Sequence, residues 1–287
     1  MTRKIALGIG IFLLAAPAAL LLIAHLALND HGVRVARDLY PADAPRVAMA
    51  VFAHPDDEIT SAGTLARMAR SGRVILVYLT RGEAYRHPAY DAETLAQVRT
   101  EEARAAGARL GAAETIVLDF PDSGLADADG AAARRLLHDL ISAHRPSVLV
   151  SFDERVGFYG HPDHAQAGRW TREVFDAEAA IPGSPVRALY QATLPRGAIA
   201  IARQISGAFR ENFPAGPARG LPAASVAIDI ASEAAAKRAL LDIHASQVAV
   251  IRDVQPGYQL MPGQLYYRVL NKEYFAAVHS RGLRPRI

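Results

Sequence analysis

The sequence contains no cysteine. Disulfide bonds, thiolate metal ligands and cysteine nucleophiles are therefore excluded. It also has no long basic run, and its 32 lysines and arginines nearly balance its 29 aspartates and glutamates. Nucleic acid is therefore not an expected partner. What the chain does have is 287 residues that are 51% hydrophobic, enough to bury the core of one large domain.

One long apolar run does occur, from Ile5 to Leu28, directly after the basic residues Arg3 and Lys4. A helix of this length, at about 1.5 Å per residue, would span a hydrocarbon core about 30 Å thick. The sequence therefore predicts a transmembrane helix within residues 1–28, which would anchor the protein in the membrane as a single-pass protein. The basic residues would stay cytoplasmic, which would place the catalytic domain on the extracytoplasmic side.

Two further boundaries follow from this segment. Residues 29–45 are mostly polar and are expected to form a linker, and residues 46–287 are expected to form one domain. Alanine-rich pairs inside the apolar run support a second interpretation, in which the segment is a signal peptide and the protein is exported after cleavage. No feature of the sequence sets the oligomeric state.

The rest of the chain alternates between short apolar runs and amphipathic segments. The runs typical of buried parallel strands are Val47–Phe52, Val74–Leu79, Glu114–Leu118 and Ser147–Phe152, with weaker strand patterns at Arg187–Thr193 and Ser225–Ile230. Helical patterns cover Asp91–Leu110, Ala131–Ala143 and Ser232–Ser246. This alternation predicts an α/β fold, a Rossmann-like and mostly parallel sheet with helices on both faces. The aromatic tail Gln264–Val278 is expected to add an edge strand.

The first predicted strand ends in the motif Ala53-His54-Pro55-Asp56-Asp57-Glu58. Pro55 favours an extended residue before it and suits the first turn of a helix, so the three acids are expected at a helix start. Neighbouring carboxylates repel one another, and their burial is costly unless a positive charge compensates. A divalent metal would compensate. An acidic helix cap on a surface loop is the alternative interpretation.

A second motif, Tyr159-Gly160-His161-Pro162-Asp163-His164, follows the fourth predicted strand. Sites in parallel sheets lie beyond the carboxyl ends of the strands, so both motifs are expected at the same edge. His54, Asp57 and His164 form a set of nitrogen and oxygen donors that suits zinc, with three protein ligands and an open position. We therefore predict one Zn²⁺ per chain, with another divalent metal as the alternative.

The remaining members of the two motifs suit supporting roles. Bound zinc lowers the pKa of its water to about 7, and Asp56 would take the proton as general base. His161, one helical turn from His164, would reach an oxyanion or a leaving group. Asp163 would orient a histidine ring.

Together the two motifs resemble those of the LmbE-like, or PIG-L, family of zinc-dependent de-N-acetylases. The resemblance covers Val47 to Gln247 and includes weaker segments at Thr80–Glu83, at Arg99 with Glu102, at Pro121–Leu125 and at His244–Gln247. The family removes acetyl groups from N-acetylglucosaminyl conjugates, including glycosyl-phosphatidylinositol and glycosyl-inositol. One departure is that Ser61-Ala62-Gly63-Thr64 stands where the family more usually has Gly-Gly-Thr.

The resemblance implies the same three metal ligands and the same base as the chemistry of the residues does. It further implies that His161 stabilises the oxyanion and that Asp163 tunes His161. Tyr159 matches the position of an active-site tyrosine in some relatives.

The expected reaction is therefore hydrolysis of the acetamide of an N-acetylated amino-sugar conjugate. The predicted membrane segment suggests a conjugate that is linked to a lipid. Two alternatives remain: a metal-dependent hydrolase of another amide, and a catalytically inactive glycan-binding protein on the same fold.

Other polar residues give weaker signals. Arg81 and Glu83 would contact the sugar or form a turn. His244 would line the site or serve the core. Arg99 and Glu102 are interpreted as an ion pair on the surface of a helix.

Overall fold

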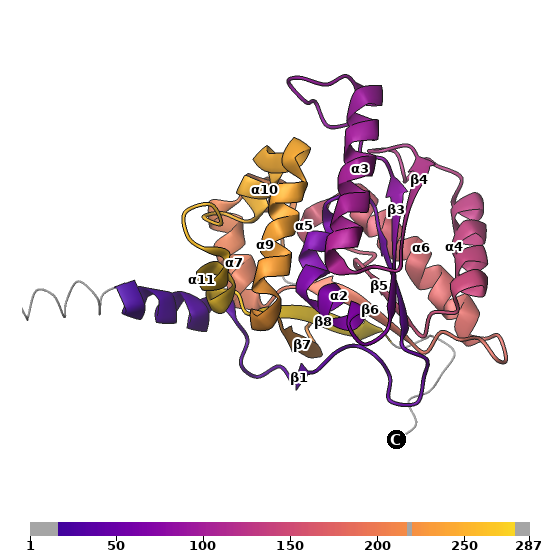
Figure 1. Ribbon diagram of the computed structural model, residues 1–287, viewed down its shortest axis with the longest axis horizontal. Helices are drawn as coiled ribbons and strands as arrows, with labels where there is room; N and C mark the ends of the chain where they lie inside the picture. Colours follow the sequence, from indigo (N-terminus) through magenta and orange to yellow (C-terminus); the bar gives the residue numbers. More distant parts are fainter. Residues whose placement is uncertain (1–16, 217–219, 279–287) are drawn as a thin grey trace, which may run out of the picture.

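The computed structural model describes residues 17–216 and 220–278 (Figure 1). In this part of the chain eight strands form one sheet, in the order β1-β7-β8-β6-β5-β2-β3-β4. The strands are β1 (Val35–Ala36), β2 (Val47–Phe52), β3 (Arg73–Thr80), β4 (Glu114–Phe120), β5 (Val148–Ser151), β6 (Ala188–Thr193), β7 (Val226–Asp229) and β8 (Lys272–Val278). All neighbouring pairs are parallel except those that β8 makes with β6 and β7. The predicted mostly parallel sheet is confirmed.

Helices cover both faces of this sheet (Figure 1). The α-helices are α2 (Ala62–Ala69), α3 (Ala92–Leu110), α4 (Gly130–His144), α5 (Gly157–Gly160), α6 (Pro162–Ala179), α7 (Arg196–Ile205), α8 (Gly207–Asn212), α9 (Ala234–Ile243), α10 (Val248–Val254) and α11 (Gly263–Val269). Short 3₁₀ helices are η1 (Asp57–Ser61), η3 (Ala231–Glu233) and η4 (Ala245–Gln247).

The core has two layers, one on each face of the sheet, because successive strand residues point to opposite faces. In β2, Ala50 and Phe52 join the layer that α2, α3 and α9 cover. Met49 and Val51 join the layer that α4 and α6 cover, which includes Trp170. Burial on both faces explains why the central strands are continuously apolar rather than alternating.

The aromatic tail does not form the predicted edge strand. Its first half is helical, as α11, and its second half is β8, which lies inside the sheet between β6 and β7. Glu273 of β8 is buried, and its carboxylate accepts hydrogen bonds from the backbone N–H groups of Gly63 (2.9 Å) and Thr64 (2.7 Å) at the start of α2. Lys237 of α9 donates to the same carboxylate over 2.6 Å. The edge prediction was wrong because β8 pairs with a strand on each side, β6 and β7.

The N-terminal prediction also needs correction. Residues 17–28 form a helix, shown in indigo in Figure 1. Among the residues that the structure describes, none of the helices is both long and apolar enough to cross a membrane. This finding overturns the predicted location as a single-pass membrane protein with an extracytoplasmic domain. The remainder of the predicted segment, residues 1–16, lies outside the described residues.

The polar segment after this helix contributes to the fold. Asn29 donates from Nδ2 to the carbonyl oxygen of Val269 in α11 over 2.7 Å. Residues 35–36 pair with β7 as the short strand β1. Leu39 and Tyr40 are buried in the core layer that α2 covers. The segment expected to be a linker therefore packs along the domain.

Candidate active site

The candidate site lies where the carboxyl ends of β2, β3, β4 and β5 meet, the expected place for a site in a parallel sheet. His54 follows β2, and Asp122 follows β4. His161 and His164 come after β5, at the start of α6. The two sequence motifs therefore meet at one edge, as predicted.

A tight loop places the histidines of α6. The carboxylate of Asp153, just after β5, accepts hydrogen bonds from the N–H groups of Val156 (2.8 Å) and Gly157 (3.2 Å). Gly157 has a φ of 63°, and a Cβ there would come within 2.4 Å of the backbone nitrogen of Ala165. Only glycine permits this approach of the loop to α6. His161 then caps the helix, since its Nδ1 accepts a hydrogen bond from the N–H of Asp163 over 3.2 Å.

The predicted ligands His54, Asp57 and His164 are brought together and are all buried. Asp57 Oδ1 lies 2.9 Å from His164 Nε2, and Asp57 Oδ2 lies 3.6 Å from His54 Nδ1. Asp57 Oδ2 also accepts from the N–H groups of Ala53 (3.1 Å) and His54 (2.8 Å). Burial alone would raise the pKa of Asp57, but the facing His164 and His54 hold that pKa well below its usual range. Asp57 is therefore an anion at neutral pH.

The other ring nitrogen of His54 faces two carboxylates. His54 Nε2 lies 3.0 Å from Asp122 Oδ1 and 3.3 Å from Asp163 Oδ2. Asp163 in turn accepts from the N–H groups of Ser123 (2.7 Å) and Leu125 (3.2 Å). The carboxylate of Asp163 thus orients the ring of His54. The family resemblance implied that Asp163 tunes His161, and that role stays a prediction. Burial lowers the pKa of His54, but the surrounding carboxylates outweigh it and raise that pKa well above its usual value.

His161 and Tyr159 lie beside this cluster. The ring of His161 stacks on that of His164 at a centroid distance of 4.6 Å, and Tyr159 lies 5.1 Å from the ring of His164. Burial, together with the neighbouring His164 and His54, lowers the pKa of His161 to about 4. Burial and the nearby carboxylates raise the pKa of Tyr159, so its hydroxyl stays protonated at neutral pH.

Asp56 takes a backbone conformation that the sequence did not predict. Its φ of 101° lies in the left-handed region that non-glycine residues rarely adopt, and the helix begins at Asp57 as the 3₁₀ turn η1 rather than at Pro55. The backbone N–H of Asp56 donates to Glu58 Oε2 over 3.1 Å. Burial raises the pKa of Asp56 to about 6, although the guanidinium of Arg99 acts to lower it.

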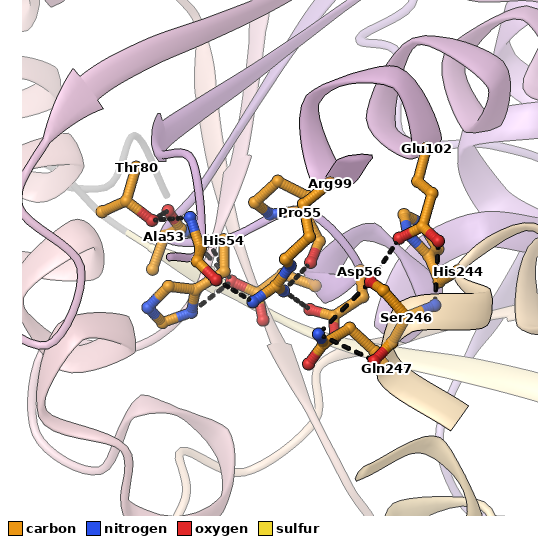
Figure 2. A network of polar contacts seen from close by, with 12 residues as sticks. Ala53, His54, Pro55, Asp56, Thr80, Arg99, Glu102, His244, Ser246 and Gln247 are labelled. Atoms are coloured by element: carbon orange, nitrogen blue, oxygen red, sulfur yellow. Dashed lines mark hydrogen bonds and ion pairs between the residues drawn. The ribbon is translucent and has the colours of Figure 1, made fainter. Parts of the chain in front are cut away.

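Arg99 is part of the site and not of the helix surface, so the predicted exposed ion pair with Glu102 is wrong. Its side chain is 4% exposed, and Nη2 lies 3.3 Å from Asp56 Oδ1 (Figure 2). It also donates from Nη1 to the carbonyl oxygen of Gly82 over 2.8 Å and from Nη2 to that of Pro55. Arg99 therefore holds the strained Asp56 turn against the loop after β3.

His244 lies behind this turn, as a fully buried residue (Figure 2). Its Nε2 is 2.5 Å from Glu58 Oε1, which is equally buried. Glu102 accepts from the N–H of Ser246 (2.8 Å) and from its Oγ (2.6 Å). The structure therefore places His244 in a support layer beneath Asp56.

Arg81 and Glu83 lie away from the cavity described below. Arg81 is 3.6 Å from Glu93 of α3 and 3.9 Å from Asp119 of β4. Glu83 accepts from the N–H of Asp122 over 3.0 Å and so supports the loop that carries this carboxylate.

A cavity of about 280 Å³ opens over the cluster. Its lining includes Asp56, His161 and Tyr159. It also includes residues that the sequence did not single out as site residues, among them Tyr85, Asp122, Val250 and Val254. Asp122 follows a strand in the same way as His54, which is the signal that could have identified it.

A signal in the sequence could also have identified Arg99 as a buried residue. It continues the buried stripe of Leu95 and Ala103 on α3, at the i, i+4, i+8 spacing.

These residues fit a divalent cation. In the described part of the chain, His54, His161 and His164 place ligand atoms within 4.8 Å of one another, and so do His54, Asp122 and Asp163. Nδ1 of His164 is buried and has no hydrogen-bond partner among the described residues. Histidine nitrogens beside a buried carboxylate are the donors that zinc and related metals take. The ligand set His54, Asp57 and His164 stays a prediction.

Comparisons with known proteins agree with this geometry. The family described as PIG-L, GlcNAc-PI de-N-acetylase, matches residues 49–175. The chain is 38% identical to a 1D-myo-inositol 2-acetamido-2-deoxy-alpha-D-glucopyranoside deacetylase from Nocardiopsis dassonvillei, over 70% of this chain and 84% of that protein. A protein of the same name from Nakamurella multipartita is 33% identical over 81% of this chain and 92% of its own length.

Solved structures share the fold. The N,N'-diacetylchitobiose deacetylase from Pyrococcus horikoshii superimposes with a TM-score of 0.58 at 19% identity, covering 82% of this chain and 84% of that one. The chain therefore belongs to the PIG-L family, whose members are N-deacetylases, and is a hydrolytic enzyme.

Proposed function

We propose that this protein is a zinc-dependent hydrolase that removes the N-acetyl group from an N-acetylglucosamine-type conjugate. The observation that carries the proposal is the position of Asp56 in one cavity with His54, Asp57, His161 and His164. The names of the two relatives above, both deacetylases of an acetamido-glucopyranoside, support a substrate of the same class. We place the catalytic domain at residues 46–287, to which the preceding segment adds β1.

His54, Asp57 and His164 would hold the metal, one ion per chain, through two ring nitrogens and a carboxylate. A bound zinc ion would supply Lewis acidity, which lowers the pKa of water and polarises a carbonyl group. Asp163 and Asp122 would keep the ring of His54 in place through its Nε2.

Asp56 would act as the general base. With a pKa of about 6 it is mostly ionised at pH 7, yet basic enough to take a proton from the attacking water. Once protonated, it could pass the proton to the departing amine nitrogen. Arg99 would fix the carboxylate in this position.

His161 would stabilise the oxyanion. Its pKa of about 4 makes the ring neutral at pH 7, and its Nδ1 accepts a hydrogen bond from the backbone. In a neutral imidazole the proton must then reside on Nε2, which becomes a donor for the carbonyl oxygen. Tyr159, protonated and in the same cavity, would be a second donor.

The test combines metal analysis with an assay of acetate release. The purified protein is expected to carry about one zinc per chain and to release acetate from N-acetylglucosaminyl conjugates, including the inositol glycoside that names the relatives. Asp56→Asn is expected to keep the metal and to lose turnover by at least about 10²-fold. Asp57→Ala is expected to lose the metal.

Asp119→Asn is the matched control, because this side chain is 89% exposed and should change neither quantity. An active Asp56→Asn variant would refute the assignment of the base. A protein that neither binds metal nor releases acetate would refute the proposed function.

A further inference from the structure

One face of α10, extended by Gln247 just before it, lines the active-site cavity, and only its Ile251 also packs into the core. Gln247, Val250, Ile251 and Val254 all contribute to the lining, and their spacing of i, i+3, i+4 and i+7 is that of one helical face. Val250 and Val254 are only partly buried, whereas Ile251 is 2% exposed. An apolar helical stripe normally packs on protein, so these valines offer contact to something inside the cavity.

The opposite side of the cavity is polar. Asp122 and Ser123 line it from the loop after β4, which lies on the other side of α3 from α10 (Figure 1), and Tyr85 lines it from the loop after β3. Hydroxyl groups of a sugar find hydrogen-bond partners on that side and none on the valines of α10. The two sides of the cavity therefore suit two different parts of a substrate.

The position of the base decides which parts these are. Asp56 lies between His54 and Gln247, the first residue of the α10 face (Figure 2). A carbonyl carbon attacked beside Asp56 has the sugar nitrogen on one side and the acyl carbon chain on the other. With the sugar on the polar side, the acyl chain points toward α10.

We propose that the α10 face is an acyl subsite that lets this enzyme hydrolyse N-acyl glucosaminides with chains longer than acetyl, such as butanoyl. This inference rests on the proposed function. Water supplies a hydroxyl group to the carbonyl carbon, the C–N bond breaks, and the nitrogen takes up the proton of that water. The products are butanoic acid, which ionises to butanoate, and the amine of the sugar, which takes up the proton that the acid releases.

The test compares methyl and phenyl glycosides of N-acetylglucosamine and N-butanoylglucosamine in the zinc-loaded protein. Each buried methylene is worth about fourfold in affinity, so kcat/KM for the butanoyl substrate is expected to equal or exceed that for the acetyl substrate. Val250→Thr and Val254→Thr keep the shape of the side chain but add a hydroxyl. Each is expected to lower the butanoyl-to-acetyl ratio by about three- to tenfold. Val248→Thr, on the same helix but outside the cavity lining, is the control and should leave the ratio unchanged.

A wild-type ratio below one, or a ratio that neither cavity variant lowers, would overturn the subsite. Variants that change the phenyl-to-methyl ratio instead would also overturn the subsite, because they would assign the α10 face to the aglycone.

Calorimetric binding of the two methyl glycosides to Asp56→Asn separates the acyl subsite from the proposed function. If the butanoyl compound binds more tightly than the acetyl compound, and Val254→Thr abolishes this difference, the subsite is supported even if the enzyme releases no acid. The absence of acid release would refute only the proposed function. Equal binding of both compounds would refute the subsite.

Discussion

Replacement of Arg99 should separate the support of Asp56 from the chemistry of the site. Arg99 projects from α3 and makes two hydrogen bonds to the buried carbonyl groups of Gly82 and Pro55, besides its contact with Asp56. Methionine has a similar length but no donor, so Arg99→Met leaves both carbonyl groups without a partner. Lysine keeps the charge but not the planar fork, so Arg99→Lys can restore only part of these contacts.

The structure gives the size of the effect. An unsatisfied buried carbonyl costs about 1–3 kcal/mol, so Arg99→Met should lower the free energy of unfolding by about 2–6 kcal/mol. Arg99→Lys should lose about half of that. Because Asp56 has a left-handed backbone and loses its partner, we also expect kcat to fall by about 10- to 100-fold in the folded variants.

Urea unfolding and acetate-release kinetics measure the two effects. Arg104→Met is the control on the same helix, because the Arg104 and Glu101 side chains that pair there are 59% and 71% exposed and should contribute less than about 1 kcal/mol. If Arg99→Met were as stable as this control, the clamp would be refuted. If KM rose while kcat stayed constant, Arg99 would bind substrate rather than hold the base.

Three further predictions concern stability. Burial lowers the pKa of His244, but the neighbouring Glu58 outweighs burial and raises that pKa above 6.5. The pair should therefore stabilise the fold fully below about pH 6.5 and less as the pH rises further. In urea unfolding of the metal-free protein, the free energy of unfolding should fall with rising pH, and His244→Gln should flatten this fall. A Cβ on Gly168 would lie 2.5 Å from a backbone oxygen just after β5, so Gly168→Ala should cost about 1–3 kcal/mol in the same assay, whereas Gly220→Ala, with no described atom within 4 Å, should cost under about 0.5 kcal/mol. Chelation should lower the melting temperature, and zinc should restore it. At a hundredfold excess of zinc over Kd the gain in the free energy of unfolding should be about 2.7 kcal/mol, and Asp57→Ala should show no response to zinc.

Local sequence patterns predicted much of the fold and the position of the histidines in the candidate site. The apolar run Val47–Phe52 could be read as a buried strand because it is apolar on both faces, and β2 has the same bounds. Because sites follow the carboxyl ends of parallel strands, the sequence predicts that His54 and His164 lie close together, and the centroids of their rings are 5.3 Å apart. Both inferences depend on short stretches of sequence.

The remainder depends on contacts between distant segments. Arg99 looks like a surface residue until the loop at Gly82 folds over it, and Glu273 looks like an edge charge until α2 places two N–H groups against it. The φ of Asp56 is imposed by the packing around it, since aspartate has no strong preference for that region. The valines of α10 have the periodicity of a core helix, and only the tertiary structure shows that they line a cavity.

The place of β8 in the sheet has a consequence for biosynthesis. In the described part of the chain β1 and β7 connect to the remaining strands only through β8, although β8 is made after all of them. A ribosome adding about 5–20 residues per second needs about 4–16 s to translate residues 194–271, between β6 and β8. During that interval β6 is an open edge that can pair with another nascent chain. Chaperone dependence and aggregation in this enzyme should therefore track the delay before β8 emerges more closely than the stability of the finished fold.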